Sequence, residues 1–203
     1  MTKSVTLGDR PVGPGHPTYI VAEIGINHNG DIELAKKLML AAKEAGVDAV
    51  KFQKRTPELC VPPEMQNIMR ETPWGYITYL EYRLKVEFGQ EQYTEIDRYA
   101  REINIPWFAS VWDEPSVDFL EPFEPICYKI PSASLTDHGL LRRVRAAGRP
   151  IVLSTGMSTM EQICAAVDVT GTENLVITHA TSTYPCEPDE LNLRMIETLM
   201  RTF

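Results

Sequence analysis

Residues 18–53 read TYIVAEIGINHNGDIELAKKLMLAAKEAGVDAVKFQ, and this stretch sets the class of the fold. Its two ends, Thr18–Gly25 and Val47–Gln53, are apolar and β-branched, as in strands buried on both faces of a parallel sheet. Asp31–Ala45 has helical spacing, begins at an acidic N-cap and ends at Gly46. The residues expected on its buried face are Leu34, Leu38, Ala41 and Ala42. The stretch therefore predicts a strand–helix–strand unit with parallel strands.

The same alternation continues along the chain. Further strands are expected at Ile105–Val111, Ile126–Ser132, Pro150–Gly156 and Asn174–Thr181. Helical patterns lie at Gln90–Glu102, Asp137–Ala147, Thr159–Val169 and Asp189–Leu199. Six strand–helix repeats predict an α/β protein with a parallel sheet.

The composition is that of a globular protein with an acidic surface. The 203 residues include 20 Lys and Arg against 28 Asp and Glu, a formal net charge of −8, and 43% are hydrophobic. Such a surface repels the phosphates of nucleic acids and anionic membrane lipids, so neither is expected as a partner. The length favours a single domain over residues 1–203.

The cysteines and the N-terminus bear on the cellular compartment. Cys60, Cys127, Cys164 and Cys186 form no C-x-x-C pair, and buried free thiols are expected at Cys127 and Cys164. Residues 1–13 lack the apolar run of a signal peptide, and no run approaches the roughly 18 apolar residues of a membrane span. We therefore expect a soluble cytoplasmic protein.

Two architectures accept six strand–helix units, an open doubly wound sheet and a (β/α) barrel. No strand is followed by G-x-G-x-x-G or G-x-x-x-x-G-K-[ST], which weakens dinucleotide and P-loop alternatives. Polar residues instead follow nearly all the strands, and in a barrel these carboxyl ends converge on one mouth. We therefore predict an α/β fold of the TIM-type (β/α) barrel class, incomplete with six βα units.

Two segments lie outside this alternation. Residues 4–17 are expected to form a small hairpin. Residues 54–89 are expected to form an extended loop with a short helix, and loops of this length are usually functional. Aromatic residues at helical spacing in 73–88 usually pack as core, although part of this segment could cover the barrel mouth.

Two lysines, Lys51 and Lys129, each lie inside an otherwise apolar strand. Because a buried ammonium group needs a partner, three alternatives arise. The lysines could form an internal ion pair, for instance with Glu23; form a Schiff base; or bind one dianionic group together at a shared mouth. Nearby hydroxyl and backbone N–H groups come from Ser132, Ser154, Thr155 and Gly156. This mixture suits a phosphate or a carboxylate, so we predict an anionic substrate.

Further candidates lie at the other strand ends. Glu23 could orient hydroxyl groups or transfer a proton, and Tyr184 could offer a phenol to a polyol. The remaining polar candidates are Gln53, Ser110 and Ser182. His28 is expected to be a hydrogen-bonding loop residue and His179 a core imidazole. No His, Asp or Glu pair shows metal-ligand spacing, so the residues alone predict no metal site.

Six motifs together resemble those of the N-acetylneuraminate (sialic acid) synthase family. In chain order they are AEIGINHNG, DAVKFQ, PWGYITYLEYR, YKIPSAS, LSTGMST and HATSTYPCEPDELNLRMI. The resemblance spans roughly residues 17–200, and it implies a (β/α)₈ barrel enzyme. Such enzymes condense phosphoenolpyruvate with an N-acetylhexosamine, N-acetylmannosamine or a related sugar, to give a nonulosonic acid and phosphate.

The resemblance also implies roles for individual residues. Lys51, Lys129, Ser132 and the Ser154–Gly156 turn would hold the phosphate and carboxylate of phosphoenolpyruvate, and Glu23, Gln53 and Tyr184 would face the sugar. C3 of phosphoenolpyruvate would attack the sugar aldehyde carbon, water would add at C2, and phosphate would leave by C–O cleavage. In this scheme Glu23, Lys51 and Lys129 are the expected catalytic residues, and neither lysine forms a Schiff base.

A divalent metal, manganese or magnesium, is expected from the family to polarise the sugar aldehyde. Its histidine ligands belong to the seventh and eighth strands, which have no counterpart in these 203 residues. The C-terminal antifreeze-like domain is also without a counterpart, and the resemblance implies a homodimer. Two alternatives therefore stay open. One is a truncated, non-catalytic barrel that binds phosphoenolpyruvate or an oligomer partner, and the other is a Schiff-base lyase.

Overall fold

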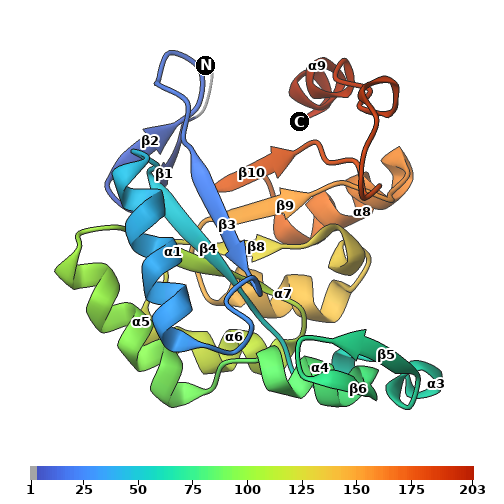
Figure 1. The fold of residues 1–203 in the computed structure, drawn as a ribbon. Coiled ribbons are helices and arrows are strands. Elements are labelled where there is room, and N and C mark those ends of the chain that lie inside the picture. Colours follow the sequence, from blue (N-terminus) through green and yellow to red (C-terminus); the bar gives the residue numbers. More distant parts are fainter. Residues whose placement is uncertain (1–3) are drawn as a thin grey trace. The chain divides into compact units, whose positions relative to one another are not determined.

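The computed structural model describes residues 4–203, which divide into two compact units. One unit contains the N-terminal segment up to Pro17 together with Ile126–Phe203, and the other contains Thr18–Pro125. Each unit has parallel strands and helices of its own (Figure 1). The predicted α/β class with parallel strands is therefore confirmed. The single barrel domain over residues 1–203, and its closure, stay predictions.

In the unit Thr18–Pro125, β4 is the middle strand. It pairs in parallel with β3 on one side and with β7 on the other. The bounds are Val21–Gly25 for β3, Ala49–Lys54 for β4 and Trp107–Val111 for β7. All three coincide with segments that the sequence predicted as strands, although β4 extends one residue further. Each strand begins later than predicted, because the apolar runs extend beyond the hydrogen-bonded pairs.

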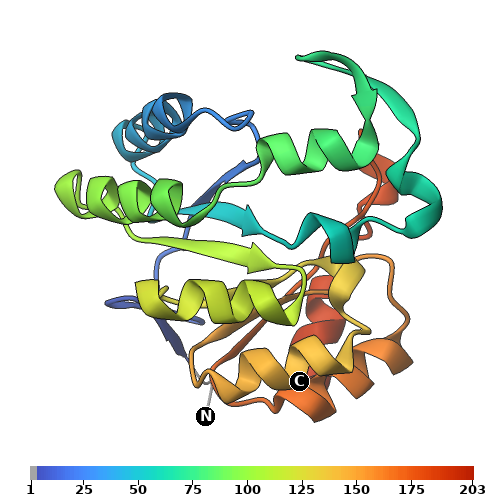
Figure 2. The ribbon, with the colours of Figure 1, turned by 90° about the horizontal axis from the view of Figure 1, so that it is seen from below.

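Helices α1 (Ile32–Glu44) and α5 (Gln90–Glu102) lie side by side in this unit (Figures 1 and 2). Helix α6 (Glu114–Leu120) follows β7 and runs into a 3₁₀ turn, η1 (Glu121–Phe123). Asp31 caps α1 as predicted, since its carboxylate accepts hydrogen bonds from two backbone N–H groups of the first turn.

The buried face of α1 differs from the prediction. Its buried residues are Ala35, Met39 and Ala42, at the i, i+4 and i+7 spacing of one helix face. Leu34 and Leu38 are only half-buried, and Ala41 is exposed. Small alanines on the inner stripe allow close packing, and the leucines flank that stripe.

Residues 54–89 are more ordered than the predicted loop with one short helix. They form α2 (Pro57–Cys60), α3 (Pro63–Gln66), an antiparallel hairpin of β5 (Met69–Thr72) and β6 (Gly75–Thr78), and α4 (Tyr79–Val86). Prolines at the first helical position start both short helices, and a Thr78–Glu81 capping box starts α4. Figure 2 shows the hairpin beyond the carboxyl end of β4.

Aromatic side chains of the unit form a core on one face of β4. Phe52 contacts the rings of Tyr93 and Trp107 edge-on, and Tyr93 in turn contacts Phe119. The Tyr93 hydroxyl donates to the backbone carbonyl of Gln53 at 2.9 Å, and burial raises its pKa. Because side chains alternate along a strand, this packing leaves the opposite face of β4 to Lys51 and Gln53.

The aromatic residues of the hairpin and α4 do not join this core. Trp74 is 38% exposed and Tyr76 is 69% exposed, whereas Phe88 is buried at 4%. Tyr79 and Tyr82 stack on each other, and Arg70 lies over both rings. The expectation that this stripe packs as core is therefore wrong for the hairpin residues.

The unit containing Ile126–Phe203 has β9 as its middle strand, paired in parallel with β8 and β10. The strands are β8 (Tyr128–Ile130), β9 (Ile151–Ser154) and β10 (Leu175–Thr178). Helices α7 (His138–Ala146) and α8 (Met160–Thr170) pack against each other, and a 3₁₀ turn, η2 (Ser132–Ser134), follows β8. In the N-terminal segment, β1 (Val5–Leu7) pairs antiparallel with β2 (Arg10–Val12).

The last predicted helix, Asp189–Leu199, is wrong at its start. A 3₁₀ turn, η3, covers Pro188–Glu190, and helix α9 begins only at Met195 and extends to Thr202. Asn192 lies between them with a φ of 43°. This left-handed conformation interrupts a right-handed helix, and asparagine tolerates it better than most residues.

Candidate functional site

Serine hydroxyls meet at the carboxyl ends of β8 and β9. Ser154 ends β9, and Ser132 begins the 3₁₀ turn after β8. The Ser132 hydroxyl donates to Ser154 Oγ at 3.1 Å and accepts from the backbone N–H of Gly156 at 3.1 Å. The predicted grouping of these three residues is therefore present in the structure.

Oxygen atoms of neighbouring residues lie closest together around Gly156. A Cβ built on Gly156 would overlap Ser182 Oγ and would lie 2.7 Å from Ser132 Oγ and 3.1 Å from the Ala180 carbonyl oxygen. Only glycine leaves room for these oxygens, because any side chain would collide with them. We call the hydroxyls of Ser132, Ser154 and Ser182 around Gly156 the serine cradle.

Lys129 lies on the same face of the strands as Ser154. Lys129 pairs in register with Val152, two residues before Ser154, and side chains two residues apart in a strand share a face. Its ammonium group is half-buried and donates to the Ile130 carbonyl oxygen at 3.2 Å. A cation on the same strand face as hydroxyl groups and a backbone N–H is a combination suited to phosphate or carboxylate binding.

The two remaining candidates of this unit do not join the serine cradle. The Thr155 hydroxyl donates to the Thr178 carbonyl oxygen at 3.0 Å. Tyr184 is 91% exposed, so its phenol contacts solvent in this structure. Their predicted roles in substrate binding stay predictions.

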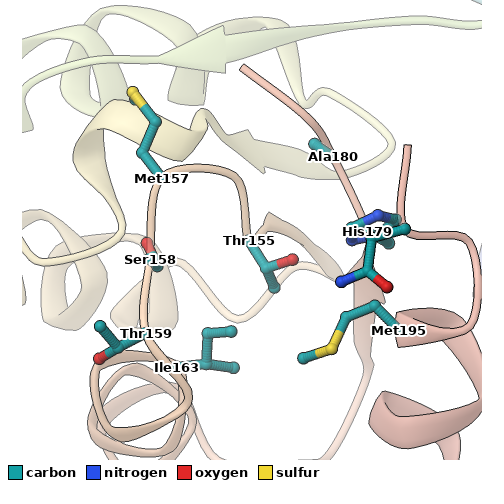
Figure 3. A pocket seen from close by; sticks show the side chains of 9 residues that line it. Thr155, Met157, Ser158, Thr159, Ile163, His179, Ala180 and Met195 are labelled. Atoms are coloured by element: carbon teal, nitrogen blue, oxygen red, sulfur yellow. The ribbon is translucent and has the colours of Figure 1, made fainter. Parts of the chain in front are cut away.

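Thr155 instead lines a pocket of about 410 Å³ between the start of α8, the end of β10 and α9. Figure 3 shows Thr155, Ile163, His179 and Met195 around it. His179 was expected to be a core residue, but it is half-buried and lines this pocket. Its Nε2 lies 2.7 Å from the Leu191 carbonyl oxygen, so the backbone holds the ring in place.

In the unit Thr18–Pro125, Lys51 forms the ion pair that was one of the three alternatives. Its ammonium group lies 3.2 Å from Glu23 Oε1 and donates to Ser110 Oγ at 3.1 Å. Lys51 is 5% exposed, whereas the Glu23 side chain is 68% exposed. A buried cation is therefore paired with a carboxylate that solvent reaches, which leaves Glu23 oxygen atoms available to a ligand.

The predicted strand-end residues of this unit share a face. Glu23 pairs in register with Lys51, and Gln53 pairs with Ser110. A bulge between Glu23 and Gly25 shifts the register at the end of β3. Bulges of this kind reorient side chains and often lie beside functional sites.

A group of buried charges was missed by the sequence predictions. It comprises Lys54, Arg55, Glu87 and Asp113. Lys54 Nζ lies 2.9 Å from Glu87 Oε1, and burial raises the Glu87 pKa although Lys54 opposes the shift. Burial and the nearby Arg83 lower the Arg55 pKa. The available signal was the continuation of the KFQ motif into two further basic residues, Lys54 at the end of β4 and Arg55 just past it.

Asp113 is a structural member of this group. It caps α6, and its carboxylate accepts from the Ser116 N–H at 2.8 Å and from the Thr56 N–H at 2.6 Å. The Cys60 thiol donates to Asp113 at 3.2 Å, and burial together with this bond raises the Cys60 pKa to about 12. Cys60 is therefore a neutral, unreactive thiol at physiological pH. Cys127 is buried as predicted, whereas Cys164 is only half-buried.

His28 is a buried residue of the loop between β3 and α1. It is 3% exposed, its ring stacks on Phe88 with centroids 3.8 Å apart, and Nδ1 accepts from the Gly30 N–H at 3.1 Å. Burial lowers its pKa from 6.5 to about 4. The expectation of a hydrogen-bonding loop histidine is confirmed.

This pKa shift predicts acid destabilisation. Because the folded pKa lies below the unfolded value, the contribution of His28 is complete above about pH 6.5 and is lost as the pH falls towards 4. The loss amounts to about 3 kcal/mol of the free energy of unfolding. Urea unfolding at pH 7.5 and pH 4 measures this loss. The difference in the free energy of unfolding between the two pH values should be smaller in His28→Gln than in the wild type, whereas His16→Gln, at an exposed site, should leave the difference unchanged. An equal pH dependence in both variants would contradict this assignment.

The described residues do not fit a divalent metal ion. Within residues 4–203, no group of three or more His, Cys, Asp or Glu side chains is placed to hold one. A ring nitrogen of both His28 and His179 is engaged by the backbone, and Glu23 is paired with Lys51. The divalent metal that the family resemblance implies stays a prediction, and the roles assigned below are those of side chains in residues 4–203.

No helix in the described part of the chain is long and apolar enough to cross a membrane.

Each unit thus places polar groups at the carboxyl ends of its own parallel strands: the serine cradle in one unit, and the Lys51–Glu23 pair in the other. A sequence model of the NeuB family matches residues 38–203. The chain therefore belongs to the NeuB family, as the motif resemblance implied.

Similar proteins carry synthase names. Human N-acetylneuraminate-9-phosphate synthase is 36% identical over 202 residues, covering 96% of this chain and 55% of the human protein. N,N'-diacetyllegionaminic acid synthase of Legionella pneumophila is 32% identical over 205 residues, covering 97% of this chain and 58% of that protein. The chain thus spans a little over half the length of these curated relatives.

The fold is similar to that of a solved synthetase structure. The N-acetylneuraminic acid synthetase of Leptospira borgpetersenii, in complex with citrate, superposes with a TM-score of 0.90 at 26% sequence identity. The match covers 100% of this chain and 68% of the Leptospira chain.

Proposed function

We propose that this chain is the phosphoenolpyruvate-binding part of a synthase that forms a nonulosonic acid and phosphate from phosphoenolpyruvate and an N-acetylhexosamine. The serine cradle carries the proposal. Its serine hydroxyls and the Gly156 backbone follow the strands on whose shared face Lys129 lies, and a cation, hydroxyls and a backbone N–H are the donors that a phosphate or carboxylate requires. Membership of the NeuB family and the synthase names of the relatives support the reaction class.

The proposed reaction forms one C–C bond and one C–O bond, the latter from water, and breaks one C–O bond, that to phosphate; the aldehyde oxygen takes up a proton and becomes a hydroxyl. C3 of phosphoenolpyruvate attacks the aldehyde carbon of the sugar, water adds at C2, and the C2–O bond to phosphate breaks. In this proposal Lys129 and the serine cradle hold the phosphate and carboxylate, with Lys51 as a second cation. Glu23, whose carboxylate solvent reaches, orients the sugar or moves a proton.

Isothermal titration and a phosphate-release assay test this function. The chain should bind phosphoenolpyruvate, and the binding should fall at least tenfold in Ser132→Ala and remain in Ser4→Ala, an exposed serine outside the cradle. With N-acetylmannosamine and Mn²⁺ present, turnover releases inorganic phosphate. Binding without phosphate release would favour the non-catalytic alternative, and absence of binding would contradict the proposal. Borohydride trapping of a pyruvate adduct on Lys51 or Lys129 would favour the Schiff-base lyase.

A homodimer with a cytoplasmic location, and a sugar of the N-acetylmannosamine type, complete the proposal. The homodimer and the sugar come from the family resemblance and the cytoplasmic location from the cysteine pattern, rather than from contacts of the described residues. Titration with N-acetylmannosamine and with N-acetylglucosamine, each in the presence of phosphoenolpyruvate, distinguishes the sugars. Sedimentation equilibrium gives the oligomeric state.

A further inference from the structure

Arg55 extends the polar row of β4 past the end of the strand. Lys51 and Gln53 share one face of β4, while Phe52 packs into the aromatic core on the other. The Arg55 guanidinium donates a hydrogen bond from Nη2 to Gln53 Oε1, which places Arg55 beside Gln53. This arginine was not among the residues predicted from the sequence.

The guanidinium of Arg55 is held in place from several sides. Arg55 is 5% exposed, and its guanidinium lies 4.4 Å from the centroid of the Trp112 ring. Glu87 accepts from the Arg55 backbone N–H at 3.1 Å, and its second oxygen lies 3.8 Å from Arg55 Nε. A buried planar donor group that stacks on an indole ring, with its backbone tied to Glu87, has little freedom to turn away from Gln53.

This contact determines which end of the Gln53 amide is available. A guanidinium group has five N–H donors and no acceptor, so the amide oxygen of Gln53 must be the atom that faces Arg55. The orientation follows from chemistry and does not depend on how the amide is placed. The amide nitrogen then points the other way, towards the end of β3, where it lies 3.4 Å from the position that a Cβ on Gly25 would occupy.

We infer that Arg55 is a positioning residue that makes Gln53 a hydrogen-bond donor towards the substrate. Gln53 therefore recognises an acceptor oxygen, such as the carbonyl of an N-acetyl group or a carboxylate, and does not accept from a sugar hydroxyl. The identity of the ligand rests on the proposed function, whereas the orientation of the amide rests on Arg55 alone. Substitutions of Gln53 test which ligand is bound, and substitutions of Arg55 test what orients the Gln53 amide.

Gln53→Glu is the first test. The carboxylate that this change introduces keeps the pairing with Arg55 but has no donor, so the thermal midpoint should hold or rise. Affinity for N-acetylmannosamine or for phosphoenolpyruvate should fall at least tenfold. The ligand whose affinity falls is the one whose oxygen accepts the hydrogen bond from the Gln53 amide. Gln90→Glu, the same change at an exposed position of α5, is the matched control. Unchanged affinity for both ligands would overturn the donor role.

Arg55→Met and Arg55→Lys form the second test, with Arg98→Met on the exposed face of α5 as the control. The side-chain amide resonances of Gln53, assigned by their loss in Gln53→Glu, should shift in Arg55→Met. Arg55→Lys restores one donor, so the resonances and the affinity should return part of the way. Resonances that do not move in Arg55→Met would overturn the inference.

The two tests keep the inference separate from the proposed function. If the wild-type chain binds neither ligand, the proposed function fails, and the amide resonances alone decide whether Arg55 orients Gln53. If Arg55→Met does not fold, Arg55→Lys and Gln53→Glu still give both readouts.

Discussion

Gly156→Ala is expected to reduce the affinity for phosphoenolpyruvate at least 100-fold. The added Cβ would overlap Ser182 Oγ and crowd Ser132 Oγ and the Ala180 carbonyl oxygen, so the serine cradle must open or the turn must move. Either change separates hydroxyls that bind as a group. A 100-fold loss corresponds to about 2.7 kcal/mol, the scale of losing one or two charge-assisted hydrogen bonds.

Isothermal titration of phosphoenolpyruvate measures this loss, with Gly89→Ala as the matched control. Gly89 has a φ of −96°, and a Cβ there would meet only Gln92 Oε1 at an ordinary 3.4 Å. The control should bind like the wild type. Ser182→Gly in the Gly156→Ala background removes the closest oxygen, and it should recover part of the affinity. If Gly156→Ala bound phosphoenolpyruvate with wild-type affinity, the serine cradle would not be part of the phosphoenolpyruvate site.

Lys51→Met and Lys129→Met are each expected to weaken phosphoenolpyruvate binding 30-fold or more. Both lysines lie in apolar strands, and methionine keeps the length of the side chain while it removes the charge. If the two ammonium groups bind one ligand, their losses are coupled. The double variant should then lose at least threefold less than the product of the single losses, a coupling of about 0.7 kcal/mol.

The double-mutant cycle tests the hypothesis that Lys51 and Lys129 act on the same anion. Lys37→Met, at an exposed position of α1, makes the same change in net charge and should leave binding unaltered. Losses that multiply without coupling would show that the lysines act independently. Loss of binding in Lys129→Met but not in Lys51→Met would restrict the phosphate site to the serine cradle and leave Lys51 as the partner of Glu23.

The strands and most helices could be predicted because their signals are local. The apolar runs at Ala49–Lys54 and Ile151–Ser154, and the acidic cap of α1, are contained within a few residues. Predictions failed where a single backbone angle or a turn decided the outcome. The left-handed Asn192 delays α9, and the prolines and capping box of residues 54–89 organise what read as a loop.

The candidate site could be predicted as a set of residue types but not as a set of contacts. Residues at strand ends, such as Lys51 and Ser154, were recognisable because polar groups after apolar runs are costly unless they have partners. Thr155 and Tyr184 also carry hydroxyl groups after apolar strands. The Thr155 hydroxyl donates to the backbone, however, and the Tyr184 hydroxyl is exposed to solvent. Sequence position does not show which way a side chain points.

The α/β class, the family and the polar residues at the strand ends can be inferred from the sequence alone, since apolar periodicity and motif order are properties of neighbouring residues. The requirement for glycine at position 156 becomes visible only in the folded chain, because the oxygens that exclude a side chain come from segments 24 and 26 residues away. The same holds for the contact between Arg55 and Gln53, because Trp112 and Glu87, which contact Arg55, are distant from it in the chain. Contacts between distant segments depend on how the segments pack, and a local sequence pattern carries no information on that packing.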